Sequence, residues 1–577
     1  MPLPKLLCIL VLLTSFGSLS AQTPDPLSPV SLPAQLPPNW KMAGTVQMAP
    51  TGSTVRTTSG NSLLTGSAGQ PLVLRLSDTD DVRVRMDVML SPDGEAIIQA
   101  GNAQIALQSG AAVGTRPTGT LTDASNRTVL PASQSVGKAP GLWQTLELAV
   151  SRNSDGRHTR VEQVRLNGVL LHENQVLPGA APPGQVSIQV PRGTAAVRRL
   201  SYQLLSGQPV VRPGAVRYKL FEGETGSAKE LTGKKLLTEG TAPAISHEVA
   251  YGQTKRYAIL FDGDFDVLKA DNLTFSLNYG GMAGLSIDGK EVIPAAYATL
   301  GQPVSAQVAL TPGKHTMQVF YGRSWPRPGL GVFVSGTGTR PQALHTTASL
   351  PEPDPVGAIT VGASDKPVMI RSFVQLPDER RKRTHVLSVG SPSGMHYSID
   401  LNQGALLQVW KGDFADVTEM WHERGEPQLL QPLGSVVILP PKNALGLLAN
   451  PTQYWPDSLN ENEFRYLGLK IDSQGHPIGQ YSYRDMGITD RIVPTGSALV
   501  RTITVTGPPS DVLYARLAGG SAIEEVAKGL YAINDRSYYV RIDSGKPTVR
   551  TSGMQKELLM PVGQKGGSTV IQYEIIW

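Results

Sequence analysis

The dominant pattern along the chain is an alternation of apolar and polar residues over short runs. Val82–Leu90 (VRVRMDVML) places valine and methionine on one face and arginine and aspartate on the other, which is the period of a half-buried β-strand. The same alternation returns in Trp143–Val150 and Val161–Leu171. The latter contains Asn167-Gly168, a dipeptide typical of a two-residue hairpin turn. We therefore predict antiparallel strands joined by tight turns.

One short stretch departs from the strand pattern. In Ala522–Lys528, Ile523 and Val526 are three positions apart and Glu524 and Glu525 lie between them, a spacing typical of one face of a helix. We predict a brief helix there and very little helix elsewhere.

Glycine and proline also divide the chain into blocks. Glycine (60 residues) and proline (45 residues) are more frequent than the roughly 12% that they make up together on average, as many turns require. Their clusters predict an all-β protein with three β-sandwich or jelly-roll modules in series. The predicted segments are a signal peptide at 1–21, a proline-rich lead-in at 22–38, and modules at 39–206, 214–345 and 356–577.

Charge and length exclude some partners. A net charge of +5 spread over 577 residues gives no basic face for a polyanion, so nucleic acid is not an expected partner. No segment is long and apolar enough for a membrane span.

The first residues have the pattern of a secretory signal. Lys5 precedes the apolar run Leu6–Leu13, and small residues precede Gln22, the order of a cleavable export signal. We expect a protein exported to the periplasm or the extracellular space. Because Cys8 is the only cysteine, cleavage would leave no disulfide and no thiolate metal site. We predict no metal and no cofactor.

The first module resembles the 3-keto-disaccharide hydrolase domain, a concanavalin-like jelly roll of exported proteins. The resemblance rests on Lys138–Val150 (KAPGLWQTLELAV), the hairpin Val164–Gly179 and the upstream segment Ser91–Gly110. It implies cleavage of an oxidised glycoside, which needs a base near the sugar ring and a donor that polarises the carbonyl. If the module is active, our candidates are Glu95 for the base and Gln104 for the donor.

The first module also departs from that family. Gln104 cannot transfer a proton, and Glu95 follows an SPDG turn, where Asp93 is explained by the turn itself. Glycoside hydrolysis normally uses paired carboxylates. Binding of sugar without cleavage, or a purely structural role, therefore stays open beside hydrolysis.

The second module resembles the protective-antigen-type β-sandwich. The phrases that carry the resemblance are Tyr257–Ile293 and Leu310–Gly322, with a predicted hairpin turn at Asp288-Gly289. Members that bind sugar through calcium use an Asp-Asp pair in a glycine-rich turn. The segment 278–281 reads NYGG at that place, so we predict no calcium site.

The third module resembles regions of large exported proteins that pair a sugar-dehydrogenase-like or cytochrome module with carbohydrate domains. The segment Leu406–Pro427 is rich in aromatic and charged residues. Tryptophan faces beside carboxylates suit stacking on a pyranose with hydrogen bonds to its hydroxyls, whereas tryptophan in a sandwich core needs no ligand. The candidate sugar-binding residues are Trp410, Asp413, Asp416, Trp421, His422 and Arg424.

Two functions remain open at this point. One is an exported hydrolase of 3-keto-glycosides. The other is a non-catalytic protein that binds oligo- or polysaccharide, or a scaffold that serves a partner redox or glycoside-processing enzyme.

Overall fold

The computed structural model describes residues 27–577 except 53, 77–80, 110–115, 154–156, 180–183, 254–255, 324–327, 351–356, 378, 423–427 and 451. The predicted signal peptide at 1–21 lies outside these residues. The described chain is all-β, as predicted, and its strands pair antiparallel. Among the described residues, helix is limited to α1 (Thr418–Trp421) and the 3-10 turns η1 (Ala228–Leu231), η2 (His247–Ala250) and η3 (Thr347–Ser349). None of these described helices has the length that crossing a bilayer requires,.

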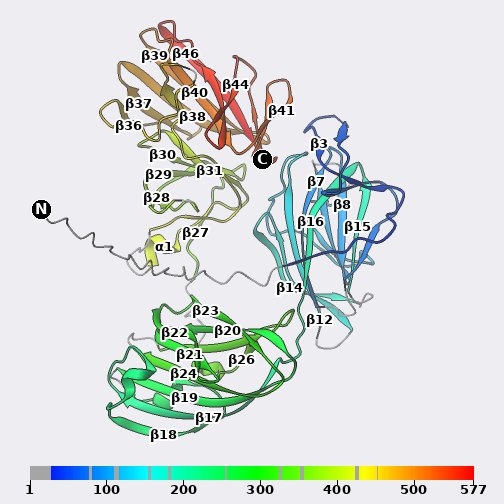
Figure 1. The fold of residues 1–577 in the computed structure, drawn as a ribbon. Coiled ribbons are helices and arrows are strands. Elements are labelled where there is room, and N and C mark those ends of the chain that lie inside the picture. Colours follow the sequence, from blue (N-terminus) through cyan, green and yellow to red (C-terminus); the bar gives the residue numbers. More distant parts are fainter. Residues whose placement is uncertain are drawn as a thin grey trace, which may run out of the picture. The chain divides into compact units, whose positions relative to one another are not determined.

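The chain forms two compact units. One is Leu205–Pro355, and the other combines Leu27–Leu204 with Val356–Trp577. Each unit is built from several sheets (Figure 1).

Residues 27–204 form a sandwich of two large sheets (Figure 1). The eight-stranded sheet has β1 (Ser28–Pro29) beside β16 and otherwise the order β14 (Val169–Pro178), β13 (His158–Leu166), β12 (Gln144–Arg152), β7 (Val82–Leu90), β16 (Thr194–Leu204), β5 (Leu63–Ser67), β2 (Trp40–Ala43). The six-stranded sheet has the order β11 (Val129–Leu130), β10 (Leu121–Asp123), β9 (Ala103–Gln108), β8 (Glu95–Ala100), β15 (Gln185–Arg192), β6 (Leu72–Arg75). A separate hairpin pairs β3 (Val46–Met48) with β4 (Val55–Thr57).

The alternation in the sequence explains this sandwich. Val84 and Ile98, from opposite sheets, are both buried in one apolar cluster, as expected where two inner faces interdigitate. The predicted strand Val82–Leu90 is confirmed. So is the hairpin turn, in which Asn167 (φ 53°) and Gly168 (φ 85°) both adopt the left-handed conformation that such a turn needs,.

The unit Leu205–Pro355 is a second pair of sheets. Its six-stranded sheet has the order β18 (Leu236–Ala242), β17 (Val211–Glu222), β19 (Tyr257–Val267), β24 (Gly313–Arg323), β21 (Gly281–Ile287), β22 (Lys290–Ala298). The four-stranded sheet has the order β23 (Val304–Leu310), β20 (Asp271–Tyr279), β25 (Leu330–Ser335), β26 (Gln342–Ala343). Aromatic residues such as Phe261 and Phe275 fill the core. The predicted turn at Asp288-Gly289 is confirmed between β21 and β22.

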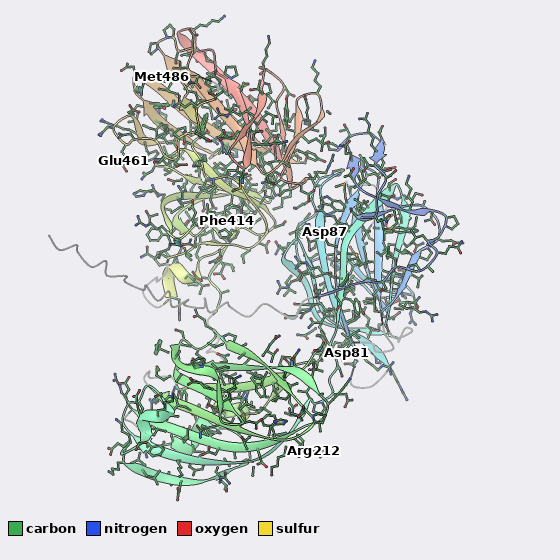
Figure 2. All side chains as sticks on the ribbon, viewed as in Figure 1. Asp81, Asp87, Arg212, Phe414, Glu461 and Met486 are labelled. Atoms are coloured by element: carbon green, nitrogen blue, oxygen red, sulfur yellow. The ribbon has the colours of Figure 1, made fainter. Side chains whose placement is uncertain are left out.

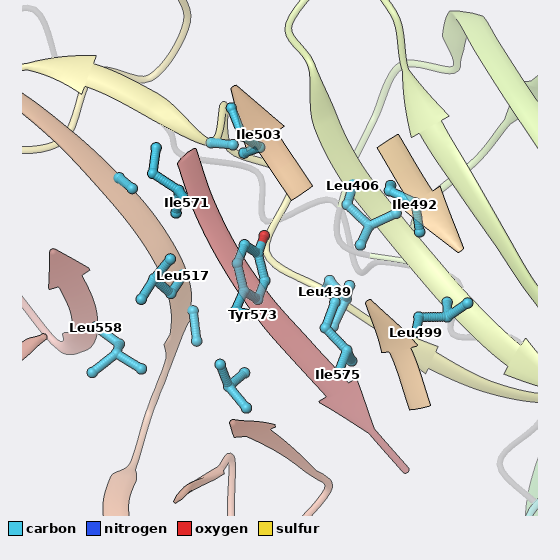
Figure 3. Close-up of a cluster of buried hydrophobic side chains, with 14 of the residues drawn as sticks. Leu406, Leu439, Ile492, Leu499, Ile503, Leu517, Leu558, Ile571, Tyr573 and Ile575 are labelled. Atoms are coloured by element: carbon cyan, nitrogen blue, oxygen red, sulfur yellow. The ribbon is translucent and has the colours of Figure 1, made fainter. Parts of the chain in front are cut away.

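Residues 357–577 contain four sheets. The five-stranded sheet has the order β28 (Val368–Val374), β29 (Arg383–Gly390), β30 (Met395–Asp400), β31 (Ala405–Lys411), β34 (Ser435–Ile438). The three-stranded sheet has β27 (Thr360–Val361), β32 (Ala415–Asp416), β33 (Gln431–Pro432), and the four-stranded sheet has β35 (Leu445–Leu447), β40 (Leu513–Gly520), β45 (Gln555–Pro561), β44 (Thr548–Ser552). The eight-stranded sheet has β36 (Phe464–Ile471), β37 (Pro477–Tyr483), β38 (Met486–Thr495), β39 (Ala498–Gly507), β46 (Gly567–Ile576), β43 (Tyr538–Arg541), β42 (Leu530–Ile533), β41 (Ile523–Ala527). Side chains from several of these strands meet in one apolar core (Figure 3).

The helix predicted at Ala522–Lys528 is wrong. Ile523–Ala527 is the edge strand β41 and pairs antiparallel with β42. A shift of register between Glu525 and Ala527 adds a residue to the strand, as a β-bulge does. Ile523 and Val526 both contact the same core, so the bulge produces the three-residue spacing that looked helical.

Residues 27–204 and 357–577 share an interface within their unit. Leu142 packs into the core of the C-terminal sheets. Arg536 is buried and donates through Nη1 to the carbonyl oxygen of Met48 at 3.0 Å, and Tyr539 donates to the carbonyl of Pro140 at 3.1 Å. Arg198 forms an ion pair with Asp535 at 2.7 Å. The two segments are therefore joined by apolar packing and by buried polar contacts.

Candidate functional site

Glu95 begins β8 in the first sandwich, and its carboxylate is held by neighbours. Arg192 Nε lies 3.1 Å from Glu95 Oε2, and Gln108 Nε2 lies 3.4 Å from Oε1. Asp93 accepts a hydrogen bond from the Ser91 hydroxyl at 3.1 Å, so it serves the turn. The carboxylate of Glu95 is therefore part of a cross-strand polar cluster.

Gln104 lies at the other end of the same hairpin. Glu95 pairs with Gln108, whereas Gln104 pairs with Gln99 and donates to its side-chain oxygen at 3.0 Å. Four residues of strand therefore separate Glu95 from Gln104, or about 13 Å. The structure places both on one sheet face but does not bring them together at one sugar ring.

Trp410 lies in the core of the C-terminal block. It is fully buried, its ring stacks on Phe414 at 5.8 Å between centroids, and its Nε1 donates to the Phe414 carbonyl at 2.8 Å. Figure 2 marks the position of Phe414. His396 lies beside both rings, and burial lowers the pKa of its imidazole. Trp410 therefore has the environment of a core residue.

The other candidates of this segment lie apart from Trp410. Asp416 accepts hydrogen bonds from the amide and hydroxyl of Thr418 and so fixes the start of α1. Trp421, at the end of α1, is 71% exposed, and His422 next to it is exposed as well. Asp413 is exposed, with its amide bonded to the Gln134 side chain at 2.9 Å. Arg424 lies outside the described residues.

A cavity of about 390 Å³ lies in the unit Leu205–Pro355. The turn η2 and the residues after it supply one wall, and the paired strands β19 and β24 supply another. Its polar and aromatic lining residues are His247, Glu248, Tyr251, Gln253, Tyr257 and Arg323.

His247 is 9% exposed, and its buried Nε2 atom has no hydrogen-bond partner among the described residues. Its backbone amide donates to the Ser349 hydroxyl at 3.1 Å, which anchors the residue on the cavity wall. Burial lowers the pKa of the imidazole; a backbone hydrogen bond and the charge of Glu248 raise this pKa by smaller amounts, and the charge of Arg323 lowers it further. A buried nitrogen of this kind is unfavourable unless a partner satisfies it.

Register brings Tyr257 and Arg323 together on the second wall. Tyr257 begins β19 and pairs with Arg323 at the end of β24. The guanidinium lies 5.6 Å from the Tyr257 ring centroid, within the range of a cation–π contact, and Nη1 donates to the Gln253 carbonyl at 2.9 Å. Burial raises the pKa of the Tyr257 hydroxyl.

Glu248 and Tyr251 complete the lining. Oε2 of Glu248 accepts hydrogen bonds from the hydroxyls of Ser246 at 3.0 Å and Thr346 at 3.3 Å. Tyr251 is 85% exposed although its ring is largely apolar. The cavity thus combines one carboxylate, one guanidinium, a buried imidazole and an exposed aromatic ring.

Sequence reasoning did not find this cavity. Most of its lining residues lie in 247–257, but Arg323 is distant in the sequence and meets Tyr257 only through the register of two strands. The segments Tyr257–Ile293 and Leu310–Gly322 were both assigned to the second module, but the pairing of their strands, which brings Arg323 to Tyr257, was not predicted. Among the described residues no cluster of three or more His, Cys, Asp or Glu side chains suits a metal ion.

The comparisons with known proteins give no family. No family model and no curated protein matches the chain. Partial similarity exists to the β-glucosidase of Kluyveromyces marxianus in complex with glucose, with 14% identity, a TM-score of 0.17, and coverage of 21% of this chain and 15% of that chain. The GH31 α-xylosidase of Xanthomonas citri gives 13% identity and a TM-score of 0.19, over 54% and 31% of the two chains.

A third partial match is an anti-sigma factor domain-containing protein from Clostridium clariflavum. It gives 10% identity and a TM-score of 0.21, over 50% of this chain and 85% of that chain. The chain therefore spans less than a third of the length of either sugar-cleaving enzyme. At these scores none of the three places the chain in a family.

Proposed function

We propose that the protein is an exported saccharide-binding protein that does not cleave its ligand, with the cavity around His247 as its binding site. The volume of about 390 Å³ lies in the range of pockets that take small ligands, roughly 300–1,000 Å³. The exposed ring of Tyr251 offers a flat apolar face of the kind on which a sugar ring stacks.

The observation that carries this proposal is the exposed ring of Tyr251 among the residues that line the cavity. The lining also includes polar side chains, among them the carboxylate of Glu248 and the amide of Gln253. A sugar hydroxyl both donates and accepts hydrogen bonds, so a sugar stacked on the ring can bond such groups.

The first sandwich supports binding over hydrolysis. The Glu95 carboxylate pairs with Arg192, and Gln104 lies about 13 Å along the strands. Cleavage needs a base and a donor at the same ring. The residues proposed for that chemistry are held apart by the fold, so their positions fit a structural role.

Calorimetric titration of the full chain with a panel of neutral mono- and oligosaccharides tests the proposal. We expect binding that weakens at least about tenfold in Tyr251→Ala, since loss of a stacked ring removes roughly 1–3 kcal/mol. Tyr454→Ala is the matched control, because Tyr454 is 71% exposed but lies in the other unit. Its affinity should equal that of the unchanged protein.

Two outcomes would overturn the proposal. One is a complete absence of saccharide binding. The other is turnover of 3-keto-glycosides that disappears in Glu95→Gln, which would restore the hydrolase. Export is tested separately, by following a reporter fused behind residues 1–21 to the periplasm or the medium.

A further inference from the structure

We infer that His315 is a pH-sensitive switch: as an imidazolium it holds the turn at residues 311 and 312 against β24, and loss of one proton releases that turn. The turn joins β23 of the four-stranded sheet to β24 of the six-stranded sheet. The switch therefore acts where the chain of Leu205–Pro355 passes from one sheet to the other. This inference is independent of the proposed function.

Both ring nitrogens of His315 face oxygen atoms that only accept hydrogen bonds. Nδ1 lies 2.6 Å from Oδ2 of Asp288, and Nε2 lies 2.8 Å from the carbonyl oxygen of Thr311. A neutral imidazole carries one N–H and satisfies one of these acceptors, whereas an imidazolium carries two and satisfies both. The arrangement is therefore complete only when His315 is charged.

His396 has the opposite set of partners. Its Nδ1 lies 3.0 Å from the amide nitrogen of Ser391, which is a donor, and its Nε2 lies 2.8 Å from the carbonyl oxygen of Gly412. A neutral imidazole protonated at Nε2 satisfies both. The pKa directions agree with these partners, because the hydrogen bond to Asp288 raises the pKa of His315 and burial lowers the pKa of His396.

The charge that faces His315 comes from Asp288, in the turn between β21 and β22. From β19 the facing residue is Phe265, whose ring stacks on the imidazole with centroids 5.9 Å apart. Lys290, which begins β22 after the turn, is exposed. The flanking charged residues of β19 and β24 point to the opposite face of the sheet, because side chains alternate along a strand, and two of them form an ion pair there: Asp264, Asp266 and Lys314,.

Loss of a proton should release one side only. A carboxylate holds an N–H more strongly than a neutral carbonyl does, so Nδ1 keeps its proton and Nε2 loses it. The lone pair of Nε2 then faces the lone pairs of the Thr311 carbonyl, and that contact becomes repulsive. Because the pKa of His315 is raised, the turn is held at and below about pH 6.5 and is released as pH rises through the folded pKa.

Hydrogen exchange of the full chain between about pH 6 and 9, followed by mass spectrometry, tests the switch. After correction for the intrinsic pH dependence of exchange, the amides of residues 311–316 should exchange at least about threefold faster at the upper end of this range, the scale of losing one hydrogen bond. The strand that holds His396, β30, is the internal control. Its corrected exchange should not change.

Asp288→Asn is the matched variant. Asparagine tolerates the left-handed φ of 49° at this position,, and its side-chain oxygen still accepts from the Thr316 amide, as Asp288 does at 2.8 Å. Its side-chain NH₂ donates to Nδ1 of a neutral His315, whose Nε2–H then bonds the Thr311 carbonyl. The turn should therefore stay in place, and its corrected exchange should not change with pH.

Each comparison has an outcome that would overturn the switch. One is a corrected exchange of residues 311–316 that stays constant with pH in the unchanged protein. Another is an increase of the same size in Asp288→Asn or in β30, because the response would then not depend on the carboxylate partner of His315.

Discussion

The surroundings of Glu95 and of His247 differ in one respect, which is whether the fold itself supplies the hydrogen-bond partners. Glu95 lies on a sheet face where Arg192 and Gln108 contact both carboxylate oxygens. His247 is at least as deeply buried, yet its Nε2 has no partner in the part of the chain that the structure describes. A partnered group stabilises the fold, whereas an unpartnered buried group is unfavourable in the absence of a ligand.

This difference separates two kinds of polar residue that look alike in a sequence. Groups such as Asp87, which accepts hydrogen bonds from Thr145 and Arg198 and is marked in Figure 2, have structural roles. The cavity in Leu205–Pro355 holds a group whose bonding is incomplete. Substitutions test this distinction, because loss of a structural group should change only the stability of the fold, whereas loss of a binding group should change the affinity for saccharide.

The largest expected effect comes from Arg536→Ala. This buried guanidinium donates to the Met48 carbonyl and pairs with Glu524 at 3.3 Å, so its removal leaves several groups without partners. We expect the unfolding free energy of the unit that contains it to fall by about 3 kcal/mol, as measured by calorimetry of the full chain. Saccharide affinity should not change.

Arg541→Ala is the control for that variant. Arg541 forms an ion pair with Glu574 at 3.0 Å but is partly exposed, so its loss should change the unfolding free energy by less than about 1 kcal/mol. Equal effects of the two substitutions would show that the Arg536 contacts do not hold the unit together.

The second-largest expected effect is a gain in stability, in contrast to the loss expected for Arg536→Ala. His247→Leu removes the unpartnered nitrogen and keeps an apolar side chain, so we expect Leu205–Pro355 to become more stable by about 1 kcal/mol. The same change alters the wall of the cavity and should weaken saccharide binding. Calorimetry and titration of the one variant measure both.

His345→Leu is the matched control for His247→Leu. His345 Nδ1 lies 3.1 Å from the amide nitrogen of Val332, so its loss leaves that amide without its partner and should destabilise the unit. If His247→Leu destabilises the unit as His345→Leu does, the imidazole of His247 is structural and the comparison fails.

Glu95→Gln should change the unfolding free energy by less than Arg536→Ala or His247→Leu does. The partner Arg192 is 43% exposed, and exposed ion pairs contribute little, so we expect a loss below about 1 kcal/mol and no change in saccharide affinity. Thermal unfolding of the variant measures this loss. A drop of several kcal/mol, or any change in affinity, would contradict a purely local structural role.

The fold was largely predictable because its determinants are local. Alternation over Val82–Leu90 and the Asn167-Gly168 turn depend on neighbouring residues only, and both are confirmed. The helix at Ala522–Lys528 was wrong because a β-bulge and a helical face place apolar residues at the same spacing,. Local pattern does not separate these two causes.

The candidate site was less predictable because it depends on which strands pair and on which side chains are buried. Trp410 and Trp421 belong to the same aromatic segment, and local sequence does not distinguish them, yet Trp410 is buried in the core and Trp421 is exposed. Tyr257 and Arg323 become neighbours only through strand register. A missing hydrogen-bond partner, as at His247, is a property of the packed structure and has no signature in the sequence.

The smallest expected effect is a pair of opposite pH dependences. Hydrogen bonds to Asp288 and to the Thr311 carbonyl raise the pKa of His315, so its stabilisation is complete below the unfolded value of about 6.5 and is lost as pH rises through the folded pKa. Burial lowers the pKa of His172, so its stabilisation is complete above about pH 6.5 and is lost as pH falls. The measurement is the melting temperature of the unchanged protein minus that of His315→Gln or of His172→Gln, taken between about pH 5 and 9. The two differences should change with pH in opposite directions. Parallel differences would mean that the carboxylate of Asp288 beside His315 and the burial of His172 do not set the response.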